Sequence, residues 1–180
     1  MKRILLLSWN LLWTTTSFGS ALTPEEVAAH IESKGTQATR EKYFSCGEKD
    51  NALGYARVEA GSEVWLKIAT RLLNDSDACY TEGLQDSIAR ALMNKPENVL
   101  PLVDSGRNLE AVYICIPFMT DTVEPTALRN QLAALNKLES SLKSVKNKKL
   151  QTQKNKCLAR VQPLQSEIRE ALTLHSRGTR

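Results

Sequence analysis

The sequence predicts an all-α protein: a single domain of short stacked helices followed by a long C-terminal helical hairpin. Three observations lead to this prediction. Glycine and proline are scarce, with eight and six in 180 residues, while the helix formers Ala, Leu, Lys, Glu and Gln are frequent. No stretch alternates apolar and polar residues as a half-buried strand does. In the C-terminal third, leucines recur every three or four residues, which is the spacing of a helical seam.

Residues 1–21 have the three parts of a cleavable signal peptide. Lys2 and Arg3 form a positive start, residues 4–13 are almost entirely apolar, and residues 19–21 have the small–x–small pattern of a cleavage site. A membrane anchor is the alternative, but the apolar run is about half of the roughly 20 residues that a spanning helix needs. We therefore expect cleavage after Ala21 and a periplasmic protein, with full secretion as the alternative.

The predicted helical body covers residues 22–121. Thr23 and Glu26 form a capping box, Pro24 occupies the first helical position, and Gly35 ends this helix. The short helices resemble the stacked pairs of an α-solenoid, but the sequence has no repeat, so an irregular helical globule is an equal alternative. Further helices are expected at 37–46, 50–59, 63–73, 77–94, 97–103 and 109–116.

The hairpin is predicted for residues 122–175, packed on the body. Two apolar stripes flank the polar stretch 146–149, so we expect two long antiparallel helices that turn there. One long helix kinked near Pro163 is the alternative, and residues 176–180 are expected to form a disordered tail. The first stripe consists of Leu128, Leu132, Leu135, Leu138, Leu142 and Val145, and the second of Leu150, Cys157, Val161, Leu164, Ile168 and Leu172.

Four cysteines follow the expected cleavage site: Cys46, Cys79, Cys115 and Cys157. In an oxidising compartment an even number of cysteines indicates disulfides. Of the three possible pairings, we prefer Cys46–Cys79 with Cys115–Cys157, because it is sequential and joins neighbouring helices. Chain entropy assigns each bridge about 4 kcal/mol of stabilisation before strain is subtracted. No C-x-x-C pair occurs, which argues against a zinc site.

Charge is distributed unevenly along the chain. Residues 22–124 contain 10 basic and 17 acidic residues, a net charge of −7, whereas residues 125–180 contain 12 basic and 3 acidic residues, a net charge of +9. Three interpretations are open: the basic residues pack against the acidic body, they form a solvated face, or they bind an anionic partner. Nucleic acid is a poor candidate, because no aromatic residues lie between the basic ones. The candidate binding surface consists of Lys137, Lys143, Lys146, Lys148, Lys149, Lys154, Lys156 and Arg160.

Catalytic motifs are not found in the sequence. The two histidines, His30 and His175, lie near opposite ends of the expected mature chain. The motifs G-x-S-x-G and H-E-x-x-H are absent, as is a glycine-rich phosphate loop. Two acidic pairs are candidates for a carboxylate-based hydrolase: Asp75 with Asp77, and Glu82 with Asp86. The sequence predicts no cofactor and no metal site.

The functional hypotheses follow from export and charge. We expect an exported, non-enzymatic protein that binds another protein of the cell envelope, for example an immunity-type inhibitor of a delivered toxin. One alternative is an envelope or cell-wall enzyme that uses paired carboxylates. Another is a structural or chaperone-like protein whose basic hairpin contacts an anionic membrane surface, without an integral membrane span. A candidate apolar cleft is placed near Trp65, Tyr80 and Phe118.

Overall fold

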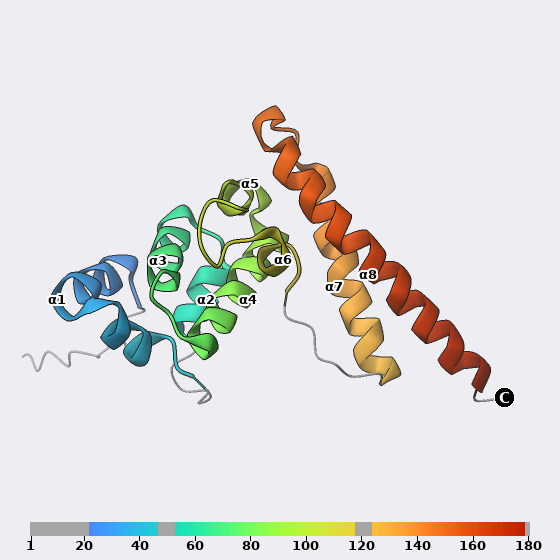
Figure 1. Ribbon diagram of the computed structural model, residues 1–180, viewed down its shortest axis with the longest axis horizontal. Coiled ribbons are helices and arrows are strands. Elements are labelled where there is room, and N and C mark those ends of the chain that lie inside the picture. The colour runs from blue at the N-terminus through green and yellow to red at the C-terminus, as the bar shows by residue number, and fades with distance from the viewer. Residues whose placement is uncertain (1–21, 47–52, 118–123, 179–180) are drawn as a thin grey trace, which may run out of the picture.

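The computed structural model describes residues 22–46, 53–117 and 124–178, which form eight α-helices and no strand. The all-α prediction is therefore confirmed for this part of the chain. Figure 1 shows the earlier helices clustered beside a long hairpin that is formed by the last two. The predicted signal peptide, residues 1–21, lies outside the described residues.

Helix α1 (Pro24–Tyr43) begins as the sequence predicts. The Glu26 N–H donates to Thr23 Oγ1 at 3.2 Å. The helical path breaks at Gly35, whose φ of 87° lies in the left-handed region that glycine adopts without steric cost. The two helices predicted on either side of Gly35 are therefore two halves of one kinked element, and the second half ends at Tyr43, three residues earlier than predicted.

The body is built around one central helix. Five further α-helices follow α1: α2 (Leu53–Glu59), α3 (Glu63–Leu73), α4 (Ala78–Asn94), α5 (Pro96–Val99), which runs into the 3₁₀ turn η2 (Leu100–Leu102), and α6 (Ala111–Ile114). Helix α4 contacts α2, α3, α5, α6 and the first hairpin helix. In a solenoid each helix pair contacts only its neighbours. Of the two alternatives, the body is therefore an irregular helical globule and not a solenoid.

Helix α6 is shorter than predicted, because the loop before it has a fixed non-helical path. Asp104 and Asn108 adopt φ values of 60° and 63°. The Asp104 N–H donates to the Leu109 carbonyl at 2.9 Å, and Asp104 Oδ1 accepts from the Ala111 N–H at 2.9 Å. Asn108 Nδ2 donates to the Leu73 carbonyl at 3.2 Å. The helix therefore starts at Ala111 instead of residue 109.

Helices α7 (Pro125–Ser144) and α8 (Gln151–Gly178) form the predicted hairpin, joined through the 3₁₀ turn η3 (Lys148–Leu150). Since α7 and α8 are separate helices that pack against each other, the alternative of one long helix kinked near Pro163 is wrong. Pro163 lies inside α8. It also extends into the segment 176–178, which was expected to be disordered. Of the leucine stripe on α7, every member is buried except Leu132, which is partly buried.

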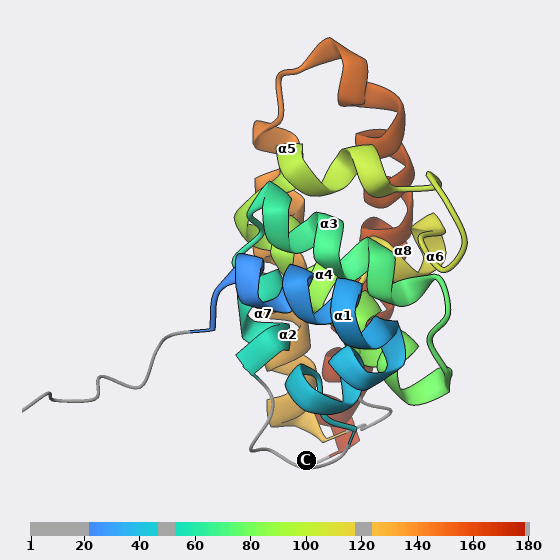
Figure 2. The ribbon, with the colours of Figure 1, turned by 90° about the vertical axis from the view of Figure 1, so that its left-hand side faces the viewer.

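The hairpin packs on the body along α4, α6 and η2, and its loop end projects beyond α5 (Figure 1, Figure 2). Lys156 Nζ lies 2.5 Å from Asp104 Oδ2, and this is the ion pair that joins hairpin and body within the described ranges. Ser141 Oγ also donates to the Leu92 carbonyl at 3.4 Å. Among the described residues, direct ionic contact between the acidic body and the basic hairpin is thus this one pair.

Both disulfides form in the preferred pairing. Cys46–Cys79 joins the residues after α1 to the first turn of α4, with the Cα atoms 6.0 Å apart. Cys115–Cys157 joins the end of α6 to α8, with the Cα atoms 4.8 Å apart. Cys46 and Cys79 are exposed, whereas Cys115 and Cys157 are fully buried. The two bridges therefore differ in their access to thiols in solution.

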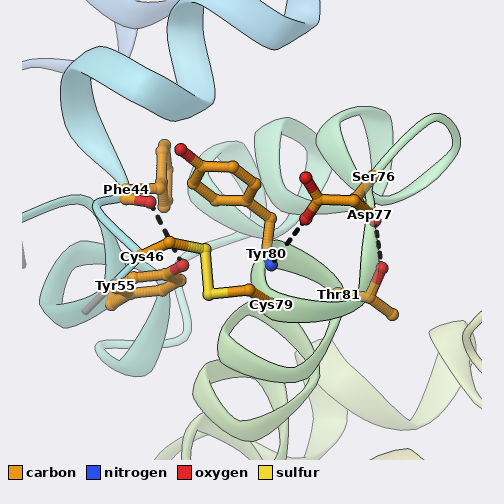
Figure 3. Close-up of a disulfide and its surroundings, with 8 residues drawn as sticks. All are labelled: Phe44, Cys46, Tyr55, Ser76, Asp77, Cys79, Tyr80 and Thr81. Atoms are coloured by element: carbon orange, nitrogen blue, oxygen red, sulfur yellow. Dashed lines mark hydrogen bonds between the residues drawn. A yellow bond between two sulfur atoms is a disulfide. The ribbon is translucent and has the colours of Figure 1, made fainter.

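The exposed bridge lies beside a small aromatic cluster (Figure 3). The rings of Phe44 and Tyr55 meet edge to face with centroids 5.3 Å apart, and Tyr55 Oη donates to the Phe44 carbonyl at 3.2 Å. Burial raises the pKa of Tyr55 to about 12. Gly83 on α4 faces this ring, because a Cβ added there would lie 2.6 Å from Tyr55 Oη. A side chain at residue 83 therefore fits only if the Tyr55 ring shifts.

Candidate functional site

The loop end of the hairpin is a hydrogen-bonded turn. Asn147 Oδ1 accepts from the Lys149 N–H at 3.0 Å, and the Asn147 carbonyl accepts from Gln151 Nε2 at 2.9 Å. Lys154 Nζ donates to the Val145 carbonyl at 3.0 Å. Val145 and Leu150, on either side of this turn, are buried. The path of the turn is thus set by local polar and apolar contacts.

Three lysines at this turn are exposed: Lys146, Lys148 and Lys149, which we call the hairpin tip. Their side chains make no ion pair or hydrogen bond with the residues that the structure describes. Three like charges this close together repel one another, and the repulsion is screened only by water and salt. The hairpin tip therefore presents an uncompensated positive charge at the projecting end of the molecule.

The other five predicted basic residues are arranged differently. Lys143 pairs with Glu139 on the same helix at 2.8 Å, and Lys156 pairs with Asp104 of the body. Lys137 Nζ lies 3.4 Å from Asn94 Oδ1. Arg160 is exposed one turn after Lys156. The hydrogen bonds from Lys156 and from the Ala111 N–H hold the pKa of Asp104 below its usual range, and the charge of Arg160 adds to this effect. Together with Lys154, whose ammonium group binds the turn, these residues are partly used within the fold.

Glu139 connects the two helices of the hairpin. Its carboxylate pairs with Lys143 and accepts hydrogen bonds from Gln162 Nε2 at 3.2 Å and from Gln165 Nε2 at 3.3 Å. These donors favour the ionised carboxylate, and together they lower the pKa of Glu139 to about 2. The one acid among the basic residues of 137–160 is therefore a structural link between α7 and α8.

The predicted acidic pairs take separate structural positions. Asp77 Oδ1 accepts from the Tyr80 N–H at 3.3 Å and caps α4. Asp86 Oδ2 accepts from Arg90 Nε at 2.8 Å, and the same Nε lies 3.7 Å from Glu59 Oε1. Burial raises the pKa of Glu59. The contacts of Arg90 tie α2 to α4.

Two residues of the predicted apolar cleft, Trp65 and Tyr80, lie elsewhere in the described fold. Trp65 belongs to the core with 7% of its surface exposed. Tyr80 lies against Arg40, whose guanidinium carbon is 5.7 Å from the ring centroid. Phe118 lies outside the described residues. An apolar cleft of about 370 Å³ opens instead between α4, α6 and α8, with Val112 and Tyr113 in its lining. Sequence reasoning missed it because the apolar run around these two residues is typical of a core.

The described residues were also compared with the requirements of a metal site and of a membrane span. His30 Nδ1 lies 2.9 Å from Thr39 Oγ1, which spans the kink of α1. The described residues contain no group of three or more His, Cys, Asp or Glu side chains that could hold a metal ion. None of the described helices combines the length and the hydropathy that a membrane span requires. A scan against protein-family models and searches of curated proteins and of solved structures found no match to this chain.

Proposed function

We propose that the mature chain is exported to the periplasm and acts there by binding another protein, with the hairpin tip as the contact for an acidic surface of that partner. The observation that carries the proposal is the separation of the basic residues. Lys146, Lys148 and Lys149 are exposed and unpaired among the described residues, while Lys143 and Lys156, elsewhere on the hairpin, form ion pairs within the fold.

Electrostatics explains what such a tip contributes. Clustered exposed lysines add little to folding stability, since even paired surface charges are worth only ~0–1 kcal/mol. They do raise the rate of encounter with an oppositely charged surface and orient the two molecules. The projecting position supports this role, because a partner can reach the tip without contacting the body (Figure 2).

Two independent features support the proposed compartment. The N-terminal 21 residues have the pattern of a signal peptide. Two disulfides join the described helices, and such bridges persist in oxidising compartments. An immunity-type inhibitor is the concrete form we favour. A small, cross-linked helical protein can block a toxin by covering an acidic surface of that toxin, without any catalytic activity.

The proposal is tested by removing the charge of the tip and nothing else. The variant K146Q/K148Q/K149Q keeps the side chains polar and is compared with K34Q/K67Q/R107Q, which removes the same charge from exposed residues of the body. Cross-linking of the tagged full chain in cells identifies the partner, and its affinity is then measured with purified proteins. Loss of three exposed charge pairs corresponds to about 5- to 100-fold weaker binding.

Three outcomes separate the hypotheses. Weaker binding of the tip variant alone, with an affinity that falls as salt rises, supports the proposal. Equal affinity of wild type and tip variant contradicts it. Salt-sensitive binding to vesicles of phosphatidylglycerol and phosphatidylcholine, lost in the tip variant and without a protein partner, contradicts it in favour of the membrane-contact alternative.

A further inference from the structure

A second surface, distinct from the hairpin tip, has the geometry of a binding cleft. It lies between α4, α6 and α8 and encloses about 370 Å³, which is within the usual range of ligand sites. Val112, Tyr113 and Ile116 form one wall and Leu164 of α8 another. Val112 and Tyr113 are 46% and 50% exposed, although large apolar side chains usually find cover in a core of this size.

A disulfide and a hydrogen bond connect the elements that form the walls of this cleft. The buried bridge Cys115–Cys157 ties α6 to α8. On the opposite side, Gln85 Nε2 of α4 donates to the Asn108 carbonyl at 2.9 Å, in the loop that leads into α6. A site whose walls are held in this way loses little conformational freedom when it is occupied, so less of the interaction energy is spent on ordering.

The rim of the cleft on α4 is acidic. Glu82 and Asp86 both line it, one turn apart on the same face of the helix. Asp86 pairs with Arg90, which also lies 3.7 Å from Glu59, so one arginine serves two carboxylates. Glu82 is exposed. The rim therefore has an excess of negative charge, and it lies directly beside an exposed apolar wall.

We infer that this cleft binds a segment of a partner protein in which a leucine or another large apolar side chain adjoins an arginine or lysine. The apolar side chain fills the space beside Val112, Tyr113 and Leu164, and the cationic group reaches Glu82 and Asp86. This deepens the proposed binding function by naming a second contact, and its charge is opposite to that of the hairpin tip. A partner that uses both contacts has an acidic region and a basic apolar segment, so it can dock in only one orientation.

The test uses short defined probes, because the partner segment is not identified. The mature chain, uniformly ¹⁵N-labelled, is titrated with acetyl-Arg-Leu-amide while amide chemical shifts are recorded. We expect saturable shifts that centre on Val112, Tyr113 and Leu164, with a millimolar dissociation constant. Acetyl-Arg-Ala-amide should bind about tenfold more weakly, since it leaves the apolar space unfilled. Acetyl-Glu-Leu-amide should bind at least threefold more weakly, since its charge is repelled by the rim.

Matched variants assign the probe to the cleft. Y113S removes an exposed apolar wall, and V64S removes a similarly exposed apolar side chain on α3, outside the cleft lining. The first variant should weaken binding of the arginine–leucine probe about tenfold and the second should leave it unchanged. E82Q should weaken the arginine–leucine probe about two- to fivefold and leave the glutamate probe no weaker.

Three results would overturn the inference: shifts that are scattered over the surface, equal binding of all three probes, or self-association of the chain that Y113S abolishes. The last would make this face an interface between copies. The hairpin-tip variant should bind the probe as wild type does. If the probe does not bind the cleft while the partner still binds through the hairpin tip, the cleft inference is wrong and the proposed function stands. If the probe binds the cleft while partner binding does not depend on the tip, the proposed function is wrong.

Discussion

The buried side chain of Arg40 links α1 to the end of α3, and its replacement makes the sharpest stability prediction. Only 5% of the residue is exposed. Nη1 donates to the Leu72 carbonyl at 3.0 Å and Nη2 to the Asp75 carbonyl at 2.9 Å. The last four carbonyls of a helix have no partner within it, and a positive charge is favourable at that end. Arg40 therefore acts as a C-terminal cap supplied by another helix.

The cost of Arg40→Met follows from these contacts. Two acceptors lose a charged donor, at about 1–3 kcal/mol each, and the contact with the Tyr80 ring adds about 0.5–1 kcal/mol. The variant also removes the cost of burying the guanidinium, whose Nε has no hydrogen-bond partner within the described residues. The net loss is roughly 2–4 kcal/mol, which in a domain of this size lowers Tm by roughly 5–15 °C.

Urea unfolding of the mature, oxidised chain measures this loss. Arg107→Met is the matched control, because Arg107 is exposed and its replacement should change the free energy of unfolding by no more than about 0.5 kcal/mol. Arg40→Lys keeps the charge but not the forked pair of donors, so it should fall between wild type and Arg40→Met. A free energy of unfolding for Arg40→Met within about 1 kcal/mol of wild type would refute the capping argument.

Three further predictions concern a bridge, a glycine and a carboxylate. Under limiting dithiothreitol, Cys46–Cys79 is reduced before the buried bridge, because a thiolate reaches exposed sulfurs first; simultaneous release of four thiols in peptide mapping contradicts this. Gly83→Ala destabilises by about 1–3 kcal/mol in urea unfolding, since overlap with Tyr55 outweighs the ~1 kcal/mol gain in helix propensity; a neutral or stabilised variant shows that the ring yields. Glu139→Gln costs roughly 0.5–1 kcal/mol at pH 7. Because the pKa of Glu139 is lowered to about 2, its contribution is complete above pH 4.5 and disappears as pH falls to about 2, where wild type and variant should converge; a difference that stays constant with pH rules this out.

The parts of the fold that were predicted correctly depend mostly on residues close together in the sequence. Helix α3 begins after Ser62 and covers the residues predicted, and the cap at Thr23 and the break at Gly35 are present. Thr23 acts through a hydrogen bond to a free N–H and Gly35 through the steric freedom of glycine, both within a few residues. Ser62 makes no side-chain capping hydrogen bond, so the start of α3 depends on the apolar pattern that follows it. The hairpin was predictable for a related reason, since a seam of leucines at helical spacing needs a second apolar stripe to cover it.

The features that could not be predicted depend on residues far apart in the chain. An arginine in a helix is usually exposed to solvent, but Arg40 is buried and its hydrogen-bond partners are the carbonyls of Leu72 and Asp75. Val112 and Tyr113 lie in an apolar run typical of a core, but the fixed loop from Asp104 to Asn108 shortens α6 and leaves them exposed. No local pattern encodes where such side chains finish, because the outcome depends on tertiary packing.

The uneven charge of the chain has a more specific form in space than in sequence. A simple attraction between acidic body and basic hairpin would place the lysines against the body. In the described residues one ion pair, Lys156 with Asp104, does so, while three exposed lysines are gathered at the hairpin tip. The leucine seam and the buried bridge Cys115–Cys157 hold the hairpin in place independently of those charges. The tip can therefore be neutralised without disturbing the fold, so that any loss of binding in the tip variant reports on recognition and not on stability.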